Sequence, residues 1–175
     1  METIKNKLTQ EEIIFFQNIQ NLLDTKLYFY GSIQRYDYLS PYSDIDVDIF
    51  TNDEKGIIIK LQNYLNVNKN NFKKTLCIMS DSESIIYGYK LKYNNEDKKI
   101  NVEFSIFNEK YKHEVIESQK KQMNISYFTC MLILFIKILH YKLNILPYKL
   151  FRRIKNKLIG LSSKAKHNFI ITDMD

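Results

Sequence analysis

The segment from residue 44 to residue 50 reads Asp-Ile-Asp-Val-Asp-Ile-Phe and alternates strictly between acidic and apolar side chains. An alternation with period two is typical of a β-strand with one face on the hydrophobic core. The apolar members would point inward, and the acidic members would share the opposite face: Asp44, Asp46 and Asp48. Because like charges are costly to bury without a cation, this pattern predicts that the acidic face meets either open solvent or bound metal.

A short apolar run, residues 27–30, precedes this segment and ends at Gly31 and Ser32. The run is typical of a strand that enters a tight turn. Gly31 allows close backbone approach, and Ser32 offers a hydroxyl and an N–H to a phosphate oxygen. Arg35 lies one turn further on and can reach the same phosphates. The turn therefore predicts a phosphate-binding element beside the acidic strand.

The stretch from Tyr30 to Phe50, YGSIQRYDYLSPYSDIDVDIF, resembles the signature of the polymerase-β-like nucleotidyltransferase superfamily. In that superfamily a strand, a Gly-Ser turn, a short connection and an Asp-x-Asp strand form the active site. Eleven residues separate Ser32 from Asp44 in this chain. The resemblance implies that Asp44 and Asp46 are a metal-binding pair and that Gly31 and Ser32 hold a triphosphate.

Family members commonly carry a third carboxylate on a later strand, flanked by apolar residues. The matching residue is Glu103, within Ile-Asn-Val-Glu-Phe at residues 100–104. The resemblance therefore assigns the catalytic, metal-binding role to Asp44, Asp46 and Glu103. The chain departs from the pattern at two positions: Tyr36 stands where a second glycine is frequent, and Glu103 where the third acid is usually Asp.

The activity that this resemblance implies is an NTP-dependent nucleotidyltransferase, with ATP among its candidate substrates. Such an enzyme transfers a nucleoside monophosphate to an acceptor hydroxyl and releases pyrophosphate. The expected cofactor is Mg²⁺, or Mn²⁺, in a two-metal mechanism.

The remaining sequence predicts an α+β fold, a mixed α/β arrangement with a nucleotidyltransferase-type mixed sheet, helices packed on one side and a helical C-terminal section. Expected helices lie at about 9–23, 52–65, 109–122, 126–143 and 148–161, and expected strands at 27–30, 44–50, 75–79, 85–93 and 100–107. No repeat or long linker interrupts the chain. We therefore expect one domain over residues 1–175, with a catalytic core at about 9–107 and a helical basic section at about 108–165.

The positive charge is concentrated in the C-terminal third. Residues 118–172 contain eleven Lys or Arg and no Asp or Glu, in a chain of net charge +6. Basic clusters without acids are typical of surfaces that bind RNA or DNA, whereas a solvated helix face is the simpler alternative. The candidate nucleic-acid-binding residues are Lys149, Arg152, Arg153, Lys155 and Lys157. They favour an RNA end as the acceptor.

Two other functions stay open. The first is a nucleotidyltransferase that modifies a protein or small molecule, as minimal family members paired with toxins do. The second is a catalytically inactive family member that acts as a nucleic-acid-binding module. An accessory protein is a further candidate partner, since 175 residues leave little room for a separate substrate-recognition domain.

The sequence favours a cytoplasmic protein. Its first residues lack the apolar core of a secretory signal, and two cysteines are too few for a disulfide framework. The apolar run Ile125–Ile136 has twelve residues, which is too short to span a bilayer. We expect no membrane span and a buried packing helix at this position.

Overall fold

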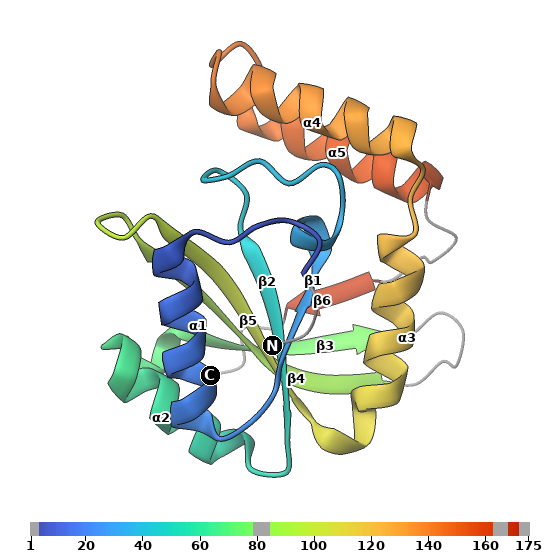
Figure 1. The fold of residues 1–175 in the computed structure, drawn as a ribbon. Helices are drawn as coiled ribbons and strands as arrows, with labels where there is room; N and C mark the ends of the chain where they lie inside the picture. The colour runs from blue at the N-terminus through green and yellow to red at the C-terminus, as the bar shows by residue number, and fades with distance from the viewer. Residues whose placement is uncertain (1–3, 79–84, 163–167, 172–175) are drawn as a thin grey trace.

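A mixed six-stranded sheet organises the described part of the chain, which in this computed structural model comprises residues 4–78, 85–162 and 168–171. Its order is β1-β2-β5-β4-β3-β6, and β2 and β5 form the parallel pair (Figure 1). The strands are β1 (Leu27–Tyr30), β2 (Ile45–Thr51), β3 (Phe72–Ile78), β4 (Ile85–Asn95), β5 (Ile100–Asn108) and β6 (Asn168–Ile171). The acidic strand β2 therefore lies inside the sheet, between β1 and β5.

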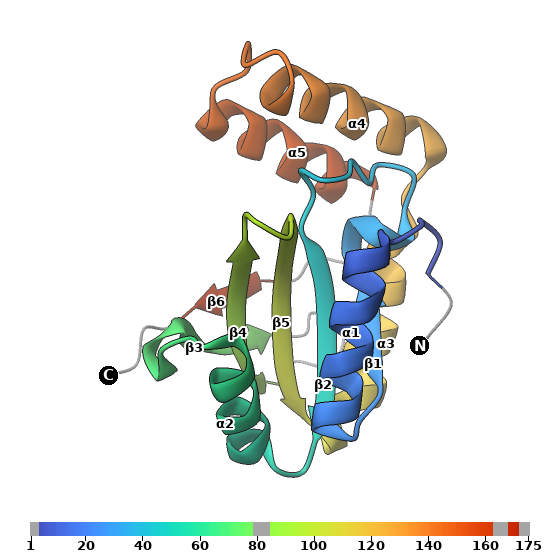
Figure 2. The ribbon, with the colours of Figure 1, turned by 60° about the vertical axis from the view of Figure 1, so that its left-hand side comes forward.

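Helices cover both faces of this sheet (Figures 1 and 2). Two of them, α1 (Gln10–Leu23) and α2 (Glu54–Leu65), pack on one face, and α3 (Lys112–Met123) lies on the other. The last two, α4 (Tyr127–Tyr141) and α5 (Tyr148–Ser162), form a hairpin across one end of the sheet. The short 3₁₀ helices are Gly31–Gln34, Lys69–Asn71 and Glu109–Tyr111.

The first helix shows how local sequence sets the boundaries. Thr9 Oγ1 accepts a hydrogen bond from Glu12 N at 3.2 Å, and Glu12 Oε2 accepts one from Thr9 N at 2.7 Å. This capping box fixes the start of α1 and satisfies two otherwise unpaired backbone N–H groups. The helix then buries Phe16 and Ile19 against Phe29 and the rest of the core.

Both faces of β2 are covered, and successive side chains of the strand therefore pack in two different clusters. Ile45, Val47 and Ile49 are buried in the main core with residues of α1 and α2. On the opposite face, Phe50 packs with Phe107 and with residues of β4 and α3 in a smaller cluster. The acidic side chains of β2 consequently lie between the sheet and α3.

The predicted α+β class with a mixed sheet is confirmed, and the five expected strands and five expected helices are all present. The strand β6 was not predicted, and β3 begins three residues earlier than expected. The predicted end of β3 at Met79 lies outside the described residues. The helices α1 and α2 lie on one side of the sheet as expected, and the expected helical C-terminal section supplies α3 on the second face (Figure 1).

The helix α4 is not the buried packing helix that the apolar run 125–136 predicted. Cys130, Ile133 and Ile136 are buried, but Phe128 and Phe135 are 71% and 57% exposed. The helix α4 lies at the end of the sheet, and no other element of the described chain covers the face that carries Phe128 and Phe135. Within the described ranges, no single helix has the length and apolar character to cross a membrane. One pair of helices has that length and composition when taken together, but an 82° bend separates its two members, Glu109–Met123 and Tyr127–Tyr141.

Candidate active site

The turn at Gly31 is shaped by its contact with β2. Gly31 has a φ of +71°, and a Cβ built on it would lie 2.0 Å from Asp46 Oδ2. Both the left-handed backbone and the missing side chain are therefore required at this position. The contact places the Gly-Ser turn directly against the second acid of the Asp-x-Asp strand.

A pocket of about 160 Å³ opens beside this contact. The residues that line it come from the turn, from β2, from α3 and from α5, and among them are Gly31, Ser32, Asp44, Asp46, Gln119 and Lys155. Ser32 is 5% exposed, and its Oγ has no hydrogen-bond partner within the described residues. A buried hydroxyl without a partner is unusual, so Ser32 is well suited to a ligand oxygen.

Asp44 and Asp46 lie together at the start of β2. Burial raises the pKa of Asp46 well above its ordinary value, and the charges of Asp44 and Glu103 raise it further. These effects favour the protonated carboxyl, whereas a bound cation would favour the carboxylate. Carboxylate oxygens are the ligands that Mg²⁺ prefers, so Asp44 and Asp46 stay the predicted metal-binding pair.

Tyr30 is a neighbour of these acids that the sequence analysis did not select. It is paired with Asp46 across the β1–β2 register, and its hydroxyl lies 3.3 Å from Ser105 Oγ. Burial, followed by the charges of Asp48 and Asp46, raises the pKa of Tyr30 well above its ordinary value. Tyr30 thus stays a neutral hydrogen-bonding group in the wall of the pocket.

The third predicted carboxylate, Glu103, is next to Asp46 in the parallel β2–β5 register but is held by two lysines. Lys90 Nζ lies 2.5 Å from Glu103 Oε1, and Lys92 Nζ lies 3.1 Å from Glu103 Oε2. Burial alone would raise the pKa of Glu103, but the two lysines outweigh it and lower that pKa. Among the described residues, no group of three or more His, Cys, Asp or Glu side chains lies close enough to hold a metal ion. The three-carboxylate site thus stays a prediction.

Asp48 is buried, although the alternation along β2 predicted that its acidic face meets solvent or metal. Its side chain is fully buried, its Oδ2 accepts a hydrogen bond from Gln119 Nε2, and its Oδ1 has no partner within the described chain. Burial raises the pKa of Asp48 to about 8. The helix α3 covers this part of the strand, and that coverage depends on tertiary packing.

Arg35, which was expected to reach phosphates, forms a buried pair with Asp37. The Arg35 Nε to Asp37 Oδ1 distance is 2.7 Å, and the Nη2 to Oδ2 distance is 2.9 Å. Arg35 also lines the pocket, so its role in phosphate binding stays a prediction. From α4, the buried Lys137 donates to the backbone oxygen of Asp37 at 2.6 Å and to Ser43 Oγ at 2.8 Å. These bonds attach the β1–β2 connection to the C-terminal hairpin.

The five predicted nucleic-acid-binding residues divide into two groups on α5. Lys155 lines the pocket and lies close enough to Asp46 to oppose the rise of its pKa. The other four are exposed: Lys149, Arg152, Arg153 and Lys157. The basic helix therefore presents one cation to the acids and the others to solvent.

The sequence matches the family model described as a nucleotidyltransferase domain over residues 13–126. The chain belongs to this nucleotidyltransferase family. The matched region contains the Gly-Ser turn, Asp44, Asp46 and Glu103, and it ends where α4 begins. The predicted recognition of a nucleotidyltransferase is confirmed, and the chemistry of the family is transfer of a nucleotide.

A search of curated proteins found no match. Among solved structures, this nucleotidyltransferase is similar to the Cid1 poly(U) polymerase bound to MgGTP, with 14% identity, a TM-score of 0.43, and coverage of 77% of this chain and 43% of that chain. A second structure of the Cid1 poly(U) polymerase gives 14% identity, a TM-score of 0.41, and coverage of 77% and 41%. The chain spans less than half the length of these proteins.

Proposed function

We propose that this nucleotidyltransferase transfers a nucleoside monophosphate from an NTP to the terminal hydroxyl of an RNA, with Mg²⁺ or Mn²⁺ as cofactor. The acceptor oxygen forms a bond to the α-phosphorus while the bond to the bridging oxygen of the β-phosphate breaks. Pyrophosphate leaves, and the proton of the acceptor hydroxyl passes to a carboxylate and then to water. The observation that carries the proposal is the contact of the Gly-Ser turn with the Asp44 and Asp46 pair.

In this proposal, Asp44 and Asp46 hold the divalent metal. When bound, the metal neutralises the triphosphate and aligns the attacking and leaving oxygens. The high pKa of Asp46 without a cation, together with its proximity to Asp44, supports this assignment.

The triphosphate lies against Gly31, Ser32 and Lys155. The glycine turn allows phosphate oxygens to approach the backbone, and the Ser32 hydroxyl has no competing partner in the described chain. Lys155 of α5 lines the same pocket and supplies a positive charge. Arg35 is oriented by Asp37 and would contribute its remaining N–H groups.

The RNA acceptor is proposed to follow the exposed side of α5. Lys149, Arg152, Arg153 and Lys157 are exposed on the helix that also carries Lys155 into the pocket. Phosphate contacts from such residues are independent of base identity and sensitive to salt. The position of these exposed cations on the same helix as Lys155 supports a polyanionic acceptor over a small molecule.

The reaction is tested by transfer of label from each α-labelled NTP to mixed RNA, DNA and protein acceptors, with Mg²⁺ or Mn²⁺. We expect labelled RNA, and no labelled product from the Asp44→Asn/Asp46→Asn variant. Label in protein alone would replace the RNA proposal with protein modification. Lack of label in every acceptor, from a protein with an unchanged melting temperature, would contradict the enzyme proposal.

A second function is favoured by the ion pairs of Glu103. Because Lys90 and Lys92 both engage this carboxylate, the chain can also act as a nucleic-acid-binding module without turnover. RNA binding that is unaffected by the Asp44→Asn/Asp46→Asn change, with no label transfer, would identify this function. A Lys90→Met/Lys92→Met variant that gains or accelerates label transfer would instead show that the lysines restrain an active site.

A further inference from the structure

A second cavity, of about 700 Å³, lies at the other end of the parallel strands from the candidate active site. Its wall includes Asn108, which pairs with Thr51 at the last position of the β2–β5 register. Asp46 pairs with Glu103 five positions earlier in that register, which is about 16 Å along the strands. The cavity is therefore separate from the pocket at Asp44 and Asp46.

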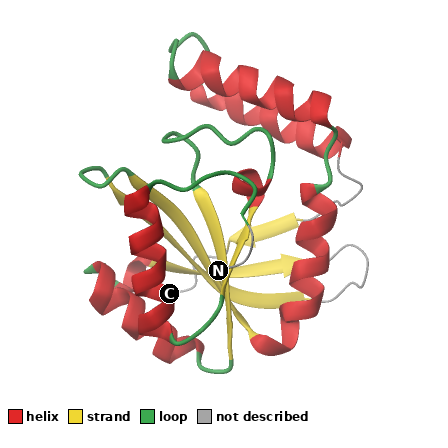
Figure 3. Cartoon of the chain, viewed as in Figure 1, coloured by secondary structure: helices red, strands yellow, loops and turns green. Residues whose placement is uncertain are grey.

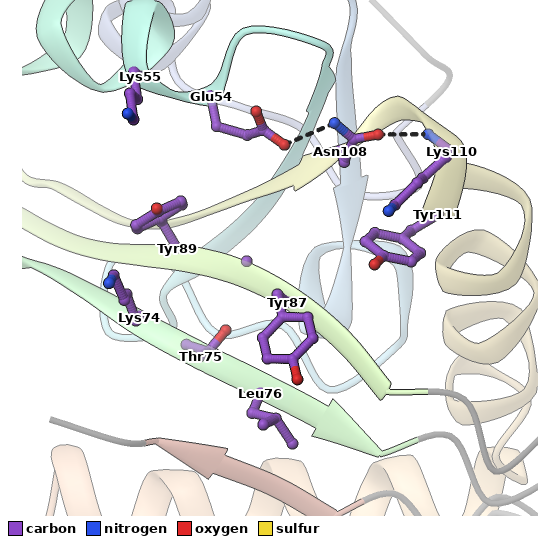
Figure 4. Close-up of a pocket in the computed structure, with 11 residues that line it drawn as sticks. Glu54, Lys55, Lys74, Thr75, Leu76, Tyr87, Tyr89, Asn108, Lys110 and Tyr111 are labelled. Carbon is purple, nitrogen blue, oxygen red and sulfur yellow. Dashed lines mark hydrogen bonds between the residues drawn. The ribbon is translucent and has the colours of Figure 1, made fainter. Parts of the chain in front are cut away.

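Two tyrosines of β4, Tyr87 and Tyr89, line this cavity together with residues of β3. Tyr89 pairs with Lys74 and Tyr87 pairs with Leu76, so these four side chains lie on the same face of the sheet. Tyr87 is 58% exposed. Tyr111 stands at the side of the cavity, on the segment that follows β5 (Figure 4). Aromatic faces of this kind stack flat rings.

The walls are positively charged. Lys55, Lys74 and Lys110 line the cavity against a single acid, Glu54, so the lining carries a net charge of +2. Glu54 Oε1 already accepts a hydrogen bond from Asn108 Nδ2 at 2.8 Å, and Lys110 Nζ lies 4.6 Å from the Tyr111 ring centroid. Within the described chain, Lys55 and Lys74 form no ion pair. The cavity therefore favours an anionic ligand.

Polar groups suited to a base edge are also present. The Glu54 carboxylate and the Asn108 amide lie on the wall formed by α2 and the end of β5 (Figure 4). An amide and a carboxylate together can donate to and accept from the edge of a base. Thr75 is also among the lining residues, but it alternates with Lys74 and Leu76 along β3, so its hydroxyl lies on the other face of the sheet.

We propose that this cavity is a second nucleotide-binding site, in which a base stacks on Tyr87 or Tyr89 and a phosphate contacts the lysines. An acidic peptide would leave the tyrosine faces unused, and a phosphate ion alone would leave both the faces and the polar wall unused. The ligand is a nucleoside monophosphate unit, either free or within a single-stranded RNA. The proposal is independent of catalysis at Asp44 and Asp46.

Acetylation footprinting of lysines, read by mass spectrometry on the full chain without metal, tests this site. The probes are the four nucleoside monophosphates, a short single-stranded RNA and inorganic phosphate. We expect protection of Lys55, Lys74 and Lys110 but not of Lys60, an exposed lysine of α2 outside the cavity. Protection by monophosphates identifies a free nucleotide, and protection by RNA alone identifies a strand. Equal protection by inorganic phosphate, equal protection of Lys60, or no protection would each overturn the proposal.

Matched variants make the test independent of overall charge and folding. Tyr87→Ala removes a largely exposed ring and should weaken binding about fivefold or more, because stacking on an aromatic side chain contributes about 1 to 3 kcal/mol per base. Tyr64→Ala removes a ring of α2 that is 42% exposed and does not line the cavity, and it should leave affinity unchanged. Lys74→Glu and Lys60→Glu form a second pair with the same charge change. If the two variants of either pair lost nucleotide affinity to a similar extent, the proposed binding site would be wrong. The binding measurement does not depend on label transfer, so a failure of the proposed enzymatic activity would leave its outcome unchanged.

Discussion

At the scale of single residues, the tightest constraint in the candidate active site lies between Gly31 and Asp46. The carboxylate of Asp46 fills the space that a Cβ at position 31 would need, and the backbone of Gly31 is left-handed. Substitution at position 31 thus has two separate costs: backbone strain and displacement of a proposed metal ligand.

The change Gly31→Ala should destabilise the protein by about 2 kcal/mol and abolish label transfer. The strain at φ +71° and the 2.0 Å approach to Asp46 Oδ2 are the physical reasons. Urea unfolding measures the first effect, and transfer of α-labelled NTP measures the second. Full activity in this variant would show that the turn can move away from Asp46 without consequence.

Gly160 provides the matched control, since a Cβ there meets no atom within 4 Å. It lies inside α5, where Ala is a better helix former than Gly. Gly160→Ala should therefore stabilise the protein by about 0.5 to 1 kcal/mol.

Sequence could predict those site residues whose relationship is local. One turn carries Gly31 and Ser32, and one strand segment carries Asp44 and Asp46, so the motif alone predicts that these residues lie close together. The ion pairs of Glu103 could not be predicted, because they depend on the register of β4 against β5, which no local pattern fixes. For the same reason the burial of Asp48 was missed: it requires Gln119 of α3 to lie over β2.

At the scale of elements, Lys137 connects α4 to the loop that precedes β2. It is 2% exposed and contacts Asp37 and Ser43, the residue before Asp44. Burial lowers the pKa of Lys137 from its ordinary value of 10.5 to about 8, although Asp37 raises it in part. The helix α4, which lies outside the matched family region, therefore helps to position Asp44, the first of the two proposed metal ligands.

This pKa predicts a defined pH dependence of stability. Between pH 8 and pH 10.5 the unfolded chain holds a proton on Lys137 that the folded chain has released, so the free energy of unfolding rises with pH. Relative to Lys137→Met, wild-type protein should gain about 2 kcal/mol between pH 7 and pH 9.5. Urea unfolding of both proteins at these two pH values measures it. An equal difference at both values would show that Lys137 titrates normally in the folded protein.

The elements that could be predicted are those with strong local signals. The capping box at Thr9 and the hairpin at residues 94–98 fixed the boundaries of α1, β4 and β5 closely. Among the described strands, β6 pairs with β3 alone, at the edge of the sheet, so its four residues form a strand because of a distant partner. The exposure of Phe128 and Phe135 likewise depends on which elements reach α4, and apolar composition cannot reveal that.

At the scale of the whole molecule, the acids of the candidate active site and the basic residues of α5 are far apart in sequence but close in space. The helices α4 and α5 pack across the end of the sheet at which β2 begins (Figure 2), and Lys155 of α5 lines a pocket with Asp44 and Asp46. Lys155 faces the acids, while Arg152 and Arg153 face solvent on the same helix. A polyanionic acceptor bound to α5 would release counterions in proportion to the phosphates that it places on these residues.

The salt dependence of RNA binding tests this arrangement. For a single-stranded RNA, the Arg152→Ala/Arg153→Ala variant should reduce the slope of log affinity against log salt by about 1.4, since each lost phosphate contact removes about 0.7. The control, Lys60→Ala/Lys69→Ala, removes the same charge from exposed lysines near α2 and should leave the slope unchanged. Titrations with labelled RNA at several salt concentrations measure both slopes. If the two variants changed the slope equally, overall charge would account for binding and α5 would not be the acceptor surface; a change confined to the arginine variant would identify α5 as the place where RNA phosphates bind.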